Sequence, residues 1–187
     1  MKLATSPYNT SVKPSHMSRP AHPSTHAILT VADIDTDCLR DLLARYGLQL
    51  ESVSDNAAIP GSFWGDSEAG LIDNRLLARG DTPVHSILHE ACHYICMDGD
   101  RRRGLHTNAG GDYDEENAVC YLQILLAAQL PDVGSGKLMQ DMDAWGYSFR
   151  LGSTARWFRD DAEDARDWLL THGLISSSGV PRTQLRT

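Results

Sequence analysis

The chain has 187 residues and a mass of 20.6 kDa, and 41% of its residues are hydrophobic while 22% are charged. A chain of this size can bury roughly 70% of the surface that its unfolded form exposes, which supports a core without disulfides and excludes a wholly disordered or fibrous protein. The net charge of −8, from 17 basic and 25 acidic residues, argues against a nucleic-acid partner, because phosphate contacts need a basic face.

The sequence also argues against a membrane protein. Its longest apolar run, residues 118–128, contains Gln123 and is about half the roughly 20 residues that a membrane-spanning helix needs. Residues 1–26 are rich in Ser, Thr, Pro and His and lack the apolar stretch of a secretory signal. We therefore expect a cytoplasmic protein with a disordered N-terminal tail. Nothing in the sequence indicates an oligomeric state.

The folded part of the chain is predicted to begin with a helix from Asp35 to Tyr46. Three leucines recur there at helical spacing, and Gly47 follows as a C-terminal stop. Between residues 51 and 79 the apolar pieces become short and are separated by Pro-Gly and Gly-Asp pairs. This change of pattern predicts two or three short strands.

Helical spacing returns after this region. Pro83 suits a first helical position, and the apolar stripe that follows predicts a helix ending near residue 98. A polar loop, residues 98–112, contains three consecutive arginines at 101–103, which we expect to be solvated unless they face an acidic substrate or partner. A further helix is predicted from Tyr113 to Leu130.

The C-terminal part is predicted as a helical cap. It covers residues 137–173, with an interruption near Gly152, and residues 176–187 are predicted to form a flexible tail. The expected organisation is a single domain at residues 27–175, in which residues 55–130 hold the core motifs.

The most informative segment lies inside the second predicted helix, where residues 89–93 are His-Glu-Ala-Cys-His. Residues four apart on a helix lie about 40° from the same face, so His89 and His93 can bind one metal ion together. Two imidazoles at this spacing predict zinc, Zn²⁺. Glu90 is then placed to take a proton from the attacking water, as a general base does in metal-dependent hydrolysis.

A catalytic zinc site needs a third protein ligand. The next predicted helix begins with an acidic cluster, in which Glu115 heads an apolar stripe that continues through Ala118 and Leu122. We therefore expect Glu115 to face inward as the third ligand. Glu116 stays open as the alternative, because this helix is apolar on most sides.

These motifs resemble a known group of enzymes. His89-Glu90-x-x-His93, followed by Glu115-x-x-Ala118 and an apolar helix, is similar to the gluzincins, the zincins with a glutamate third ligand. More narrowly, the pattern resembles the small ImmA/IrrE-type zinc metallopeptidases, in which a strand precedes the HExxH helix and a glutamate-bearing helix follows it. The resemblance covers roughly residues 55–130.

The resemblance implies both a fold and an activity. The fold would be α+β, a zincin-like metallopeptidase domain with a small, mostly antiparallel sheet, an active-site helix and a helical C-terminal cap. His89, His93 and Glu115 would be zinc ligands, and Glu90 would be the general base that hydrolyses a peptide or protein substrate. The strand near residues 71–78 would be the sheet edge with which an extended peptide pairs.

Two other functions stay open at this stage. The chain is also compatible with a zinc-binding regulatory or interaction module that cleaves nothing, and with a metal-dependent hydrolase of a non-peptide amide bond. Accessory residues stay open too. His106, Tyr113, Tyr147 and His172 are candidates to donate a hydrogen bond to the oxyanion. His85 is expected on the helix surface, with support of the metal site as its alternative role.

Overall fold

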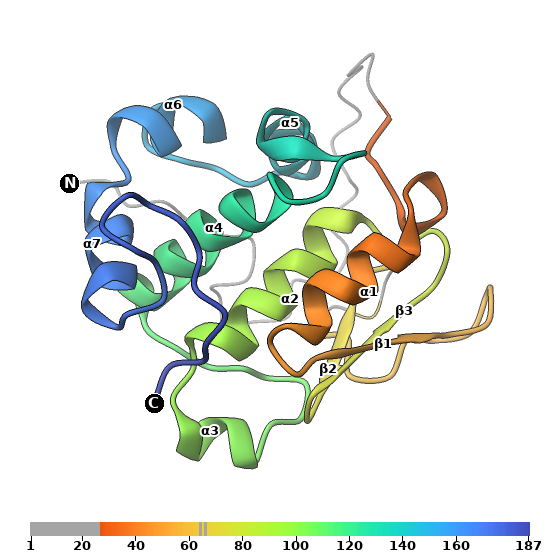
Figure 1. Ribbon diagram of the computed structural model, residues 1–187. Helices are drawn as coiled ribbons and strands as arrows, with labels where there is room; N and C mark the ends of the chain where they lie inside the picture. The colour runs from red at the N-terminus through yellow and green to blue at the C-terminus, as the bar shows by residue number, and fades with distance from the viewer. Residues whose placement is uncertain (1–26, 64, 66) are drawn as a thin grey trace, which may run out of the picture.

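The computed structural model describes residues 27–63, 65 and 67–187, so the predicted N-terminal tail lies outside the described residues. The fold is α+β, as predicted, and Figure 1 shows the arrangement of its elements. In chain order these are the 3₁₀ helix η1 (Val31–Asp33), α1 (Thr36–Ala44), β1 (Gln49–Ser52), β2 (Gly70–Ile72), β3 (Arg75–Ala78), α2 (Val84–Cys96), α3 (Gly99–Arg103), α4 (Tyr113–Ala127), α5 (Gly134–Trp145), α6 (Thr154–Asp160) and α7 (Glu163–Thr171).

The predicted first helix is present as α1, which is somewhat shorter than expected. The Asp35 carboxylate caps it by accepting hydrogen bonds from the backbone amides of Asp37 and Cys38. Leu39, Leu42 and Leu43 are buried, so the leucine spacing that predicted the helix also supplies its inward face.

The sheet is mixed, which corrects the expectation of a mostly antiparallel one. Its strand order is β1-β3-β2, and β3 pairs parallel with β1 but antiparallel with β2. Strands β2 and β3 are joined by a two-residue turn in which Asp73 has a φ of 54°, so they must run antiparallel. The long segment 53–69 separates β1 from β2 and leaves enough chain for a parallel pairing with β3. The short apolar piece at 57–59 forms no strand.

Strand β3 is the central strand, so it cannot be the sheet edge that the resemblance implies. The outer edge of β2 is also occupied. The Leu71 amide donates to the Gly61 carbonyl at 3.2 Å, and the Leu71 carbonyl accepts from Thr107 at 2.9 Å. The Asp73 amide donates to Leu105 at 3.0 Å. An extended peptide therefore cannot add to β2 along these groups unless this pairing opens.

Helix α2 lies at the centre of the molecule, with α1 and the sheet on one side and α4 on the other (Figure 1). All of its residues except Glu90 are buried. Helices α5 and α7 pack against α4, and α6 packs against α5. Within the described residues, no helix combines the length and the apolar character that crossing a bilayer demands.

Two segments differ from the sequence prediction. The loop after α2 contains the short helix α3, which the Asp98 carboxylate caps through the amides of Asp100 and Arg101. Residues 176–187, for which we predict a flexible tail, fold back onto the domain: the Arg182 amide donates to Leu174 at 2.8 Å, and the Arg186 amide donates to Ile95 at 3.0 Å. The structure thus brings this segment beside the end of α2 (Figure 1).

Candidate metal centre

Helix α2 presents His89 and His93 on one face, as their spacing predicts. Both imidazoles are buried, with 0% and 7% of their residues' surface exposed. Their Nε2 atoms lie 3.1 Å apart, and the two rings are nearly perpendicular at 89°. The two Nε2 atoms therefore point to one place, where a shared proton or a metal ion could lie between them.

Gln123, on α4, sets the orientation of His89. Its Oε1 lies 3.0 Å from Nδ1 of His89, and its Nε2 donates to the sulfur of Met142 at 2.9 Å. Because an amide oxygen only accepts, Nδ1 carries the proton and Nε2 of His89 keeps its lone pair for a metal. Sequence reasoning missed this role, although the single glutamine within the apolar run 118–128 was a usable signal.

The third donor is Glu116. One of its carboxylate oxygens lies 3.3 Å from Nε2 of His89, and the other lies 3.4 Å from Nε2 of His93. Ligand atoms about 2.0 to 2.1 Å from a tetrahedral zinc ion are about 3.3 Å from one another. The 3.1 Å between the two Nε2 atoms is close to that edge length, and each Glu116 oxygen lies at a similar distance from one of them, at 3.3 and 3.4 Å. His89, His93 and Glu116 form a group that could hold a metal ion, the only one found among the described residues.

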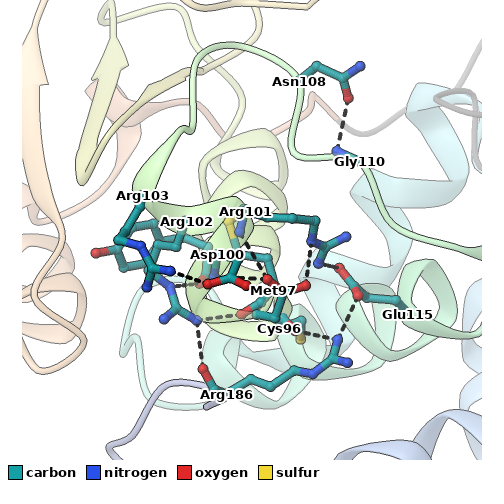
Figure 2. A network of polar contacts seen from close by, with 12 residues as sticks. Cys96, Met97, Asp100, Arg101, Arg102, Arg103, Asn108, Gly110, Glu115 and Arg186 are labelled. Atoms are coloured by element: carbon teal, nitrogen blue, oxygen red, sulfur yellow. Dashed lines mark hydrogen bonds and ion pairs between the residues drawn. The ribbon is translucent and has the colours of Figure 1, made fainter.

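The preference for Glu115 as third ligand is therefore corrected. Glu115 is buried, but its carboxylate faces Arg101 at 2.5 Å and Arg186 at 2.9 Å (Figure 2). Consecutive helical residues are about 100° apart, so turning Glu116 toward α2 turns Glu115 toward α3 and the segment at residue 186. Helix α4 is apolar on most sides, and for that reason its apolar pattern did not distinguish the two positions.

The charges of the site fit a cation. Burial lowers the pKa of His93 to about 4. Burial also opposes protonation of His89, but the nearby Glu116 carboxylate holds the pKa of His89 well above its ordinary value. Glu116 thus stabilises a positive charge beside His89. A proton can supply this charge, and a metal ion bound by the same atoms would replace the proton.

Glu90 is the neighbour of His89 on α2 and the only residue of that helix that is not buried. Loss of hydration raises the pKa of its carboxyl to about 8, and the negative charges of Glu116 and Glu68 act in the same direction. No described residue forms a hydrogen bond or ion pair with Glu90. Its carboxyl is therefore available to a water or a substrate beside the metal ligands.

Aromatic side chains enclose the other side of His89. The ring of Tyr147 lies 5.9 Å from the ring of His89 and 5.7 Å from that of His85, and Trp145 lies 5.1 Å from His85. Trp145 Nε1 donates to the carboxylate of the buried Glu68 at 3.1 Å. His85 is fully buried and not on the helix surface, which corrects the first expectation for it, and burial lowers its pKa to about 3.

Of the four candidate oxyanion donors, Tyr147 is the one with a ring contact to a metal-site histidine. His106 is exposed and pairs with the Thr107 hydroxyl at 2.9 Å. His172 stacks on Trp168, and its Nδ1 lies 2.8 Å from the carbonyl of the same residue. Tyr147 thus lies beside the candidate metal site, whereas His106 and His172 pair with other residues.

Comparisons with protein-family models, with curated proteins and with solved structures found no match. The donor atoms and their spacing are therefore what indicates a metal centre. The chemistry of the donor set, two imidazoles and a carboxylate, is the one that zinc takes in catalytic sites with an open fourth position.

Proposed function

We propose that this protein is a zinc-dependent hydrolase that cleaves amide bonds, and peptide bonds in particular. The observation that carries the proposal is the convergence of His89, His93 and Glu116 at the spacing of zinc ligands, with Glu90 next to them on the same helix. The order of an HExxH helix followed by a glutamate-bearing helix also supports membership of the ImmA/IrrE-type metallopeptidases.

Bound zinc supplies polarisation of the scissile carbonyl and a lower pKa for water, so that hydroxide is available near neutral pH. Glu90 accepts a proton from the attacking water as the new carbon–oxygen bond forms. It then passes this proton to the amide nitrogen as the carbon–nitrogen bond breaks, which leaves a carboxylic acid and an amine. Because Glu90 alone on α2 reaches partial solvent exposure, it can meet both water and substrate.

Two side chains assist in this scheme. Gln123 fixes the tautomer of His89, as its 3.0 Å contact with Nδ1 requires. Tyr147 packs against the ring of His89, and we assign it the hydrogen bond to the oxygen that becomes negative during attack.

The occupied edge of β2 favours a second candidate function, the hydrolysis of a non-peptide amide in a small molecule. Backbone groups of residues 61 and 105–107 already use the hydrogen bonds that an extended peptide would make there. A small substrate needs no sheet edge, because it can be recognised by side chains around the metal alone.

One experiment tests both candidates. The zinc-loaded wild type and its Glu90→Gln variant are incubated with a mixed peptide library and with a panel of small N-acyl amides, and products are identified by mass spectrometry. We expect cleavage by the wild type only, with the same zinc content in both proteins, whereas Glu163→Gln, an exposed control on α7, cleaves normally. Equal cleavage by Glu90→Gln would refute the mechanism. Zinc binding without cleavage of either substrate set would indicate a non-catalytic metal module.

A further inference from the structure

Arg186 connects a distant segment of the chain to the ends of the two helices that carry the metal ligands. Its amide donates to the carbonyl of Ile95 at 3.0 Å, and its Nη1 donates to the carbonyl of Cys96 at 3.2 Å. These two carbonyls belong to the last turn of α2 and would otherwise lack helical partners. The guanidinium also lies over the ring of Trp168 at 5.0 Å. Arg186 is thus fixed by three kinds of contact.

The same guanidinium reaches the first turn of α4. Its Nη1 donates to one carboxylate oxygen of Glu115 at 2.9 Å, and Arg101 donates to the other oxygen (Figure 2). Asp98 holds Arg101 in turn at 3.1 Å. Gly111 approaches so closely that a Cβ on it would lie 3.0 Å from Glu115 Oε1. Glu115 is therefore held from two sides and covered by backbone.

We propose that Arg186 is a positioning residue for the metal centre. By holding Glu115, it fixes the rotation of the first turn of α4, and therefore the direction of the adjacent ligand Glu116. The inference rests on the metal centre of the proposed function but not on hydrolysis. Under this inference, residues that do not contact the metal help to set the affinity of the site for it.

The direction of the change in zinc affinity distinguishes a positioning role of Arg186 from a purely electrostatic role and from a role in fold stability alone. Removing a positive side chain near a cation site, by electrostatics alone, favours the cation and strengthens binding. A contact that only stabilises the fold leaves the affinity of the folded protein unchanged. Weaker binding requires displacement of a ligand, and outer contacts of metal ligands are worth roughly 10-fold to 100-fold in affinity.

The test measures the dissociation constant of Zn²⁺ by competition with a chromophoric chelator, at a temperature where every variant is folded by circular dichroism. Arg186→Ala is compared with Arg182→Ala, which removes the same charge from the same segment at an exposed position with no side-chain partner among the described residues. We expect binding about tenfold weaker for Arg186→Ala, no change for Arg182→Ala, and partial recovery in Arg186→Lys, which keeps a donor for Glu115.

The d–d absorption of the cobalt-substituted protein gives a second readout. A displaced Glu116 should change this spectrum in Arg186→Ala but not in Arg182→Ala. Unchanged or tighter zinc binding by Arg186→Ala would overturn the inference while leaving the metal centre intact. Absence of zinc binding by the wild type would overturn the metal centre itself, so the two failures are distinguishable.

Discussion

Glu115 and Glu116 are neighbours in the sequence but have opposite surroundings. Glu115 is enclosed by two arginines, each of which pairs with one oxygen of its carboxylate. Glu116 faces two imidazole nitrogens. The partners supplied by other elements, and not the position of a glutamate in a motif, therefore decide whether its carboxylate pairs with arginines or faces the candidate metal site.

The largest effects are expected when the carboxylate of Glu115 or of Glu116 is exchanged for an amide. Glu116→Gln removes a ligand charge, so zinc binding should weaken by more than about 100-fold, above the range for outer contacts. Glu115→Gln should weaken it by no more than about tenfold, but should lower the free energy of unfolding by about 2 kcal/mol, because two guanidinium groups lose a charged acceptor. Chelator competition and urea unfolding measure the two effects. Equal zinc affinities in the two variants would contradict the assignment.

The orientation of His89 provides the next largest effect. Gln123→Leu removes the acceptor for Nδ1, so the imidazole can change tautomer or rotate, and zinc affinity should fall by roughly 10-fold to 100-fold. Gln140→Leu, at an exposed position of α5, is the matched control and should bind zinc normally. If both variants bound zinc like the wild type, Gln123 would have only a packing role.

The smallest expected effect concerns the close backbone approach to Glu115. Gly111 has a φ of 114°, and an added Cβ would lie 3.3 Å from Glu115 Cδ. Gly111→Ala should therefore destabilise the protein by about 1 kcal/mol or more, because both the conformation and the contact oppose it. Gly136→Ala, inside α5 with open space around the new methyl group, should stabilise it slightly. Thermal unfolding measures both, and a stabilising Gly111→Ala would show that the approach is not tight.

Local signals in the sequence were sufficient to predict α2 and α4, the helices that carry the candidate metal ligands. The apolar stripe after Pro83 and the acidic start of α4 placed these helices within a few residues, and the spacing of His89 and His93 gave their shared face. The partners of Glu115 were not predictable in the same way. Arg101 lies in an arginine run that indicates a solvated loop, and Arg186 lies in a segment predicted to be flexible. Such pairings form across 14 and 71 residues of chain, and no periodic pattern encodes them.

The pairing of the strands was likewise not predictable from local patterns in the sequence. Short strands were expected between residues 51 and 79, yet their order depends on how the long segment 53–69 returns to the sheet. Pairing partners, and the backbone groups that close the edge of β2, follow from this path and not from the composition of the strands.

A crystal structure of the protein with zinc, examined by anomalous scattering at the zinc edge, is the decisive test of the metal centre. We expect one strong peak about 2.0 to 2.1 Å from Nε2 of His89, from Nε2 of His93 and from a carboxylate oxygen of Glu116. A peak coordinated by Glu115, or no peak between the two histidines at saturating zinc, would contradict it.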